Sequence, residues 1–223
     1  MDSNLIVMLT YNDRTVSNAY DLFDQCKDLP VQYWGFKDVG VPKEEMVRII
    51  EAMKAAGKTT FLEVVSYTEA ECMRGAKLAV ELGYDHLMGT IYYQSVFDYL
   101  AKQDIKFLPF CGKVYGSPSV LEGTFAEIIA DANSLLQKGV YGIDLLSFRH
   151  KDGTGLAEAY CKAIDKPVVI AGSINSPERL RFIDKIKPWA YTMGTALFNQ
   201  NFAPGKDFRE NLEAVLAEIE KIG

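Results

Sequence analysis

The sequence has few cysteines, no long apolar run and no block of like charge. Its four cysteines lie far apart without a Cys-x-x-Cys pair, which disfavours a disulfide framework or a zinc site and favours a reducing compartment. No five consecutive residues share one charge sign, so no interaction tail is indicated. The first apolar run, residues 5–9, follows no basic segment and is too short for a signal peptide or a membrane span. We therefore expect a cytoplasmic protein that does not contact a membrane.

The composition is that of an ordinary globular domain. The 223 residues are 48% hydrophobic and 24% charged, and a chain of this length buries a large core without disulfides or metals. The formal net charge of -6 disfavours nucleic-acid binding, which needs clustered Lys and Arg. No linker or low-complexity segment interrupts the pattern, so residues 1–223 are predicted to form a single domain.

Short apolar runs alternate with helical segments eight times along the chain. The runs lack apolar/polar alternation, which is typical of strands buried on both faces. Between them, apolar residues recur at helical spacing, and Thr68/Glu71 and Thr124/Glu127 are candidate capping boxes. This pattern predicts an α/β fold, a single (β/α)8 TIM barrel with eight parallel strands. The expected strands cover residues 5–9, 32–36, 60–65, 85–89, 105–110, 142–147, 167–171 and 190–194.

The alternative fold is a doubly wound open sheet. That fold usually has a glycine-rich turn after its first strand, and residues 9–13 contain no glycine. The barrel is therefore the favoured architecture. The longest connection, residues 111–123, is rich in Gly, Ser and Pro and is a candidate lid loop after the fifth strand.

Functional sites of such barrels form at the carboxyl ends of the strands. Gly172–Ser173 and Gly194–Thr195 follow the last two strands. Glycine lets backbone N–H groups approach an anion closely, and a helix start adds a positive dipole. We expect these four residues to bind a phosphate; the alternative is that both are ordinary strand-to-helix turns.

A candidate acid–base pair follows the second and third strands. Lys37 is the first residue past the second apolar run, and Glu63 is the one charge within the third. An isolated buried carboxylate is costly, so Glu63 needs a cationic partner, and Lys37 is the nearest by topology. Such a pair can move protons, and the alternative is a purely structural ion pair. Asp13 and Asp38 are candidate substrate-binding residues beside it.

A small basic cluster, Arg149-His150-Lys151, follows the sixth strand. Arg149 is a candidate ligand for a second anionic group, and His150 is a candidate catalytic acid or base near neutral pH. The alternative is an exposed loop with scattered charges. His86 opens the fourth strand at the opposite end of the barrel and is expected to be structural.

Residues 171–174 and 193–198 resemble the phosphate cup of the ribulose-phosphate-binding barrel superfamily. That group contains isomerases of histidine and tryptophan synthesis, hexulose-phosphate synthases, sugar-phosphate decarboxylases and the glycerol-phosphate-responsive antiterminator. The resemblance implies a barrel that binds a phosphorylated small molecule, and often a homodimer. It is specific over residues 167–198 and only architectural elsewhere.

The sequence departs from the catalytic patterns of that superfamily. The aspartate-x-lysine-x-x-aspartate motif of the decarboxylase branch is absent from residues 62–67, and residues 143–148 lack a Schiff-base lysine. The paired aspartates of the isomerases are only partly matched, by Asp13. Phosphate binding is therefore better supported than any one reaction.

Two functions are expected from different classes. The first is a lyase or isomerase that acts on a small phosphorylated sugar or sugar-like metabolite by acid–base chemistry. The second is a phosphometabolite sensor resembling the antiterminator, which would need a basic face for RNA. No cofactor is required by the pattern. Carboxylates of Asp13, Asp38 and Glu63 could hold Mg²⁺, but no spacing demands a metal.

Overall fold

A computed structural model describes residues 3–222; the ends of the predicted domain, residues 1, 2 and 223, lie outside this range. All eight predicted strands are present in one parallel sheet, which confirms the barrel. Each strand overlaps its predicted apolar run. In chain order they are β1 (Asn4–Met8), β4 (Tyr33–Lys37), β5 (Thr59–Val64), β6 (His86–Gly89), β7 (Lys106–Leu108), β10 (Ile143–Leu145), β11 (Val168–Ile170) and β12 (Ala190–Met193).

The strands follow one another around the barrel in chain order, and β12 pairs with β1. The remaining joint, between β7 and β10, is narrow. A parallel bridge joins Phe110 to Asp144, and two backbone bonds run from Tyr141 N to Phe107 O and from Asp144 N to Pro109 O, each 3.0 Å. This joint closes the ring.

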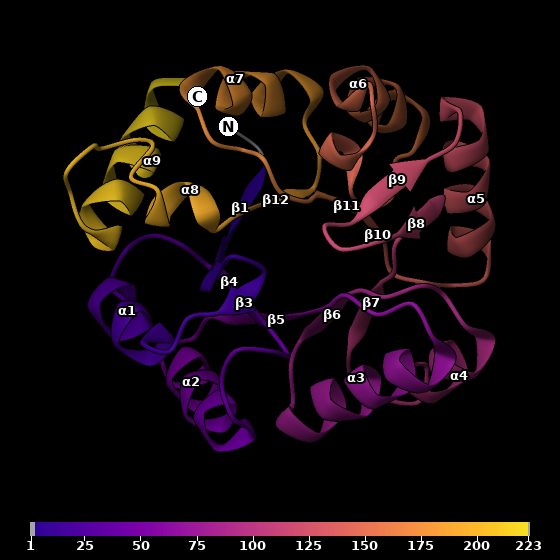
Figure 1. The fold of residues 1–223 in the computed structure, drawn as a ribbon, viewed down its shortest axis with the longest axis horizontal. Helices are drawn as coiled ribbons and strands as arrows, with labels where there is room; N and C mark the ends of the chain where they lie inside the picture. Colours follow the sequence, from indigo (N-terminus) through magenta and orange to yellow (C-terminus); the bar gives the residue numbers. More distant parts are fainter. Residues whose placement is uncertain (1–2, 223) are drawn as a thin grey trace.

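Helices surround the strands in an outer layer (Figure 1). Each main helix follows a strand and returns the chain to the start of the next one. The helices are α1 (Ala19–Cys26), α2 (Lys43–Ala55), α3 (Glu69–Leu82), α4 (Gln94–Leu100), α5 (Phe125–Gln137), α6 (Gly153–Ala163), α7 (Pro177–Ile186), α8 (Thr195–Phe198) and α9 (Phe208–Ile222), with a short 3-10 turn η1 (Ser147–Arg149).

Strand alternation divides the buried residues into two sets. One set, which includes Val7, Leu62 and Leu145, packs under the helices. The other fills the barrel interior and consists of Ile6, Met8, Phe61, Met88, Leu108, Val169 and Ala190. By the same period of two, Glu63 on β5 has the inward parity of Phe61, and Asp144 on β10 is the registered partner of the inward residue Val169.

The helix starts agree in part with the sequence. Thr124 and Glu127 form the predicted capping box at α5. At α3, the Thr68 hydroxyl accepts the Glu71 N–H, but the Glu71 side chain bonds the Thr68 hydroxyl rather than its backbone N–H. The second capping box is therefore only half formed.

Two short antiparallel hairpins lie at the carboxyl end of the barrel, and neither was expected from the sequence. The first joins β2 (Thr10–Tyr11) to β3 (Arg14–Thr15). The second joins β8 (Lys113–Tyr115) to β9 (Val120–Glu122), so the expected lid loop is a paired hairpin. The Tyr67 hydroxyl fixes its tip, 2.8 Å from both Gly116 O and Ser119 Oγ.

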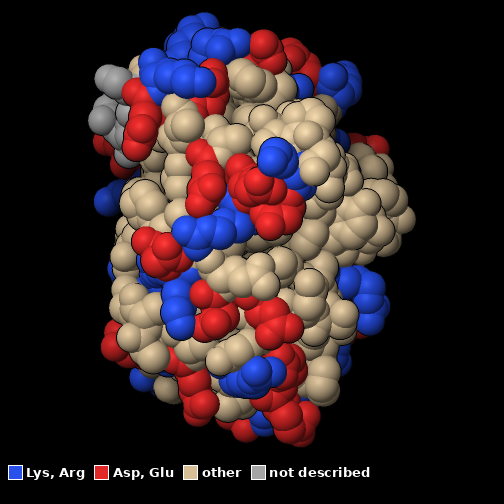
Figure 2. Space-filling model, turned by 90° about the vertical axis from the view of Figure 1, so that its left-hand side faces the viewer, with Lys and Arg blue, Asp and Glu red and all other residues tan. Residues whose placement is uncertain are grey.

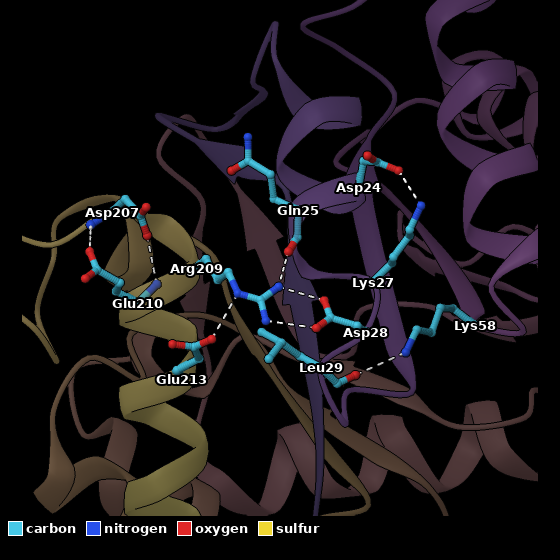
Figure 3. Close-up of polar contacts among 10 residues, drawn as sticks. All are labelled: Asp24, Gln25, Lys27, Asp28, Leu29, Lys58, Asp207, Arg209, Glu210 and Glu213. Atoms are coloured by element: carbon cyan, nitrogen blue, oxygen red, sulfur yellow. Dashed lines mark hydrogen bonds and ion pairs between the residues drawn. The ribbon is translucent and has the colours of Figure 1, made fainter.

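The last helix is tied to the first by an ion network on the molecular surface (Figure 3). The Arg209 guanidinium of α9 bonds both carboxylate oxygens of Asp28, at 2.6 and 2.9 Å, and its Nε donates to Glu213 at 2.9 Å. It also donates to the Gln25 carbonyl at the end of α1. This network joins two helices that lie side by side in the outer layer (Figure 1).

The face on the left-hand side of Figure 1 carries interspersed residues of both charge signs (Figure 2). Blue and red residues alternate, and neither sign gathers into a broad patch on this face. Among the described helices, none combines the length and apolar character needed to cross a bilayer.

Candidate active site

A cavity of about 260 Å³ opens at the carboxyl ends of the strands, which we call the mouth cavity. Its wall combines the ends of the first three strands with the turns after the sixth, seventh and eighth. It therefore brings together most of the residues singled out from the sequence: Asp13, Lys37, Glu63, Arg149, Gly172, Ser173, Gly194 and Thr195.

Lys37 and Glu63 meet in this cavity, as the sequence predicted. They are registered partners on neighbouring strands, with Lys37 Nζ 3.8 Å from Glu63 Oε1. Their side chains are only 9% and 14% exposed. Lys37 Nζ also contacts Asp13 Oδ1 at 3.1 Å, although the Asp13 side chain is largely exposed. The ammonium thus lies between a buried and a solvated carboxylate.

The β2–β3 hairpin holds Asp13 and Lys37 in place. Its turn residues, Asn12 and Asp13, have φ of 49° and 58°, as a two-residue hairpin turn of this kind requires and as these residue types tolerate. Next in the hairpin, the Thr15 hydroxyl donates to Lys37 O at 2.8 Å and accepts Lys37 N–H at 2.9 Å. The Asn-Asp pair was the sequence signal for this turn.

The surroundings of Lys37 and Glu63 raise the pKa of both groups. Burial lowers the pKa of Lys37, but Glu63 and Asp13 outweigh it, and the net pKa lies above its usual value. Burial is the largest influence on Glu63 and raises its pKa, while the Lys37 charge opposes the rise. The raised pKa of Lys37 favours its ammonium form, and the raised pKa of Glu63 makes its carboxylate a stronger base than that of an ordinary glutamate.

Sequence reasoning missed Asp144. It lies on β10 at the inward position below Leu146, which lines the mouth cavity, and it is fully buried. Burial raises the pKa of Asp144 well above its usual range, and the Glu63 charge raises it further. The signal was present, because Asp144 is the one charge in the sixth apolar run just as Glu63 is in the third.

The two glycine turns lie on the same wall of the cavity. The Gly172 N–H donates to the Thr192 hydroxyl at 2.9 Å, which ties the turn after β11 to β12. The next residue, Ser173, has φ of 62°, so Gly172 and Ser173 are two successive residues in the left-handed region. A side chain at Gly194 would meet Thr10 O at 2.8 Å and Met8 O at 2.9 Å, so only glycine fits against β1 there.

The other predicted site residues are placed less centrally. Asp38 faces away from the mouth cavity, into a surface groove by α3 that it shares with Arg74. Arg149 lines both the mouth cavity and a neighbouring groove. His150 lines only that groove, with its Nδ1 accepting Asp152 N–H at 3.1 Å and its Nε2 3.0 Å from Gly123 O. His150 thus pins the end of the β8–β9 hairpin.

His86 lies at the opposite end of the barrel, as predicted. Its ring stacks on Phe61 with centroids 4.2 Å apart, beside Trp189 and Tyr141. Burial lowers its pKa to about 4.

The arrangement of acidic side chains bears on metal binding. Within residues 3–222, no three His, Cys, Asp or Glu side chains gather in a way that could hold a metal ion. Asp13 and Glu63 share the mouth cavity but Asp38 does not, so these three do not form the Mg²⁺ site considered from the sequence.

The eight parallel strands form a closed ring with the mouth cavity at their carboxyl ends, which is a (β/α)8 TIM-barrel fold. This agrees with the resemblance seen in residues 167–198. No protein-family model and no curated protein sequence matches the chain.

Solved structures with the same fold match over almost the whole chain. Orotidine 5'-phosphate decarboxylase from Pyrococcus horikoshii OT3 has a TM-score of 0.72 at 13% identity, covering 97% of this chain and 99% of its own. N-(5'-phosphoribosyl)anthranilate isomerase from Pyrococcus furiosus has 0.65 at 13%, covering 98% and 99%. N-acetylmannosamine-6-phosphate 2-epimerase from Clostridium perfringens has 0.65 at 11%, covering 97% and 93%. At these identities the likeness concerns the fold.

Proposed function

We propose that this protein is an enzyme that binds a small phosphorylated metabolite and moves a proton on it, as a lyase or isomerase. The observation that carries the proposal is the shared cavity. The buried Lys37–Glu63 pair and the two glycine turns line the same 260 Å³ space. A phosphate on the turns would anchor one end of a substrate and hold its reacting carbon near the pair.

The charges of the pair assign the two roles. Glu63 is the base that takes a proton from a carbon next to a carbonyl group. Lys37 stays an ammonium between two carboxylates, so it stabilises the negative charge that forms on the substrate oxygen rather than acting as a nucleophile. Arg149, at the rim, is suited to a second anionic group of the substrate. The structural neighbours include a decarboxylase, an isomerase and an epimerase whose names carry phosphate groups, which supports this class.

The sensor alternative is less well supported. A barrel that contacts RNA needs a basic face. The net charge is -6, and the face seen in Figure 2 mixes both signs.

Phosphate binding is tested with inorganic phosphate by calorimetry. Gly194→Ala should weaken binding about tenfold to 100-fold, because the added Cβ displaces the turn from the Thr10 and Met8 carbonyls and costs charge-assisted hydrogen bonds. Gly57→Ala is the control: its φ of 69° also makes alanine costly, but a Cβ there meets nothing and the position lies at the end of α2, outside the mouth cavity. Wild-type protein that fails to bind phosphate, or equal weakening in both variants, contradicts the proposed site.

Proton transfer is tested without knowing the product. Phosphorylated aldoses and ketoses are incubated with the protein in D₂O, and deuterium incorporation is followed by NMR. Glu63→Gln should slow exchange about 100-fold or more, the usual scale for a general base. Glu51→Gln, on the exposed side of α2, should leave exchange unchanged. Exchange that persists in Glu63→Gln would remove Glu63 from the mechanism.

A further inference from the structure

Asp144 is a carboxyl group next to the mouth cavity that the ion pairs described above do not use. It is fully buried, and neither of its oxygens has a hydrogen-bond partner among residues 3–222. A carboxyl group in that situation is costly, and far more costly when ionised. Its position on β10, one inward step below the cavity-lining Leu146, directs it into the barrel interior beneath the Lys37–Glu63 pair.

The buried centre holds one cation and two carboxyl groups. The Lys37 ammonium is engaged by Glu63 at 3.8 Å and by Asp13 at 3.1 Å. Asp144 forms no ion pair with it within the described chain. Two ionised carboxylates here would leave an excess negative charge away from water, which a protein interior does not tolerate without a second cation. Of the two, Glu63 has the ammonium contact, so Glu63 carries the charge and Asp144 keeps its proton.

The electrostatic surroundings agree with this assignment. Burial and then the Glu63 charge raise the pKa of Asp144, while the Lys37 charge and the nearby Gly89 backbone lower it without reversing the rise. The Cys111 thiol also lies near Asp144, and burial raises the pKa of that thiol. The charged groups that act on Glu63 itself are Lys37, Asp13, Asp38 and Arg149.

We infer that Asp144 is a positioning residue of the acid–base centre, a neutral carboxylic acid that acts on a substrate only through Glu63. Its catalytic meaning rests on the proposed function. When Glu63 accepts a proton, the substrate C–H bond breaks, an O–H bond forms on Glu63, and the electron pair stays on the substrate as an enolate facing Lys37. Because Asp144 is already protonated, it neither draws that proton from Glu63 nor competes for Lys37. The proton then returns to the substrate or exchanges with solvent through Glu63.

The protonation state of Asp144 is measurable in the free protein. Aspartate and glutamate carboxyl carbons are labelled with ¹³C and followed by NMR through a pH titration, with Asp144→Asn and Glu63→Gln to assign the signals. One aspartate should remain protonated at neutral pH and vanish in Asp144→Asn. In Glu63→Gln its midpoint should fall by about one pH unit or more, the size at which two sites are coupled. Glu51→Gln should leave it in place.

An Asp144 that is ionised at neutral pH overturns the inference, and so does a midpoint that Glu63→Gln does not move. If Glu63→Gln folds poorly, a second measurement, the free energy of unfolding as a function of pH, still tests the inference. The unfolded wild type releases the Asp144 proton above its ordinary pKa whereas the folded protein retains it, so wild-type stability falls as pH rises. Asp144→Asn should remove this fall; parallel stability curves would contradict the assignment. Phosphate calorimetry on the same samples tests the proposed function separately, since it does not depend on Asp144.

Discussion

Removal of the Lys37 charge is the sharpest test of the buried pair. In Lys37→Met, Glu63 loses the ammonium 3.8 Å away while its side chain stays 14% exposed. At that separation and an effective dielectric of about 20, the pair attraction is roughly 4 kcal/mol. Removing one partner of a buried pair typically costs about 3–5 kcal/mol, because the other charge is left uncompensated.

Protonation of Glu63 sets an upper limit to this loss. Neutralising a glutamate with an ordinary pKa of about 4.3 costs about 3.7 kcal/mol at neutral pH, and about 1 kcal/mol near pH 5, at about 1.36 kcal/mol per pH unit. Because burial already raises the pKa of Glu63, we expect a loss of about 2 to 3.5 kcal/mol at neutral pH, below this limit. In the variant, folded Glu63 keeps a proton that the unfolded chain releases, so the destabilisation grows as pH rises above the unfolded pKa.

The assay is urea unfolding of wild type, Lys37→Met and the double variant Lys37→Met/Glu63→Gln at neutral pH and near pH 5. The double variant should be more stable than Lys37→Met at neutral pH, because no buried charge is left to neutralise. Near pH 5 the two variants should converge. A Lys37→Met loss of equal size at both pH values, or a double variant no better than the single one, would refute the reasoning.

Two further predictions concern the rest of the barrel. Burial and the Lys106 charge lower the pKa of His86 to about 4, so the unfolded chain binds a proton first as pH falls below about 6.5. The free energy of unfolding should therefore decline from about pH 6.5 towards pH 4, and His86→Leu should flatten this decline in thermal melts. An unchanged slope in His86→Leu would show that other groups cause the decline. Arg209→Met should lower the melting temperature, because the network of Figure 3 no longer ties α9 to α1. Arg209 lowers the pKa of Asp28 to about 2, so this loss should be full above about pH 4 and fade as pH falls towards 2; Lys27→Met, at an exposed pair with Asp24, is the control and should change little.

The sequence predicted the barrel because its signal is spread over the whole chain. Eight apolar runs and their spacing determine strand number and direction, and each run overlaps an observed strand. The Lys37–Glu63 contact was predictable for a different reason: a lone charge in a buried strand requires a partner, and parallel neighbours bring equivalent positions together.

Other parts of the site were not predictable in the same way. Asp38 directly follows Lys37, and strand alternation sends it to the opposite side, which a list of residues after a strand does not distinguish. His150 resembled a catalytic residue by type and place, but its two ring nitrogens are engaged by backbone groups of Asp152 and Gly123, and such local bonds cannot be read from sequence spacing. The β8–β9 hairpin depends on cross-strand pairing in a segment of mixed polarity, where the apolar pattern is weak.

The narrow joint between β7 and β10 has a consequence for motion. The β4–β5 ladder pairs five residues of each strand, whereas this joint relies on the Phe110–Asp144 bridge and two neighbouring backbone bonds. Amide exchange with deuterated solvent proceeds through local openings, which are easiest where few backbone bonds hold two elements together. The Asp144 amide should therefore exchange sooner than amides of the β4–β5 ladder. Each such opening would also admit water beside the Asp144 carboxyl group. Local opening of the β7–β10 joint would therefore give solvent protons a route to the barrel interior.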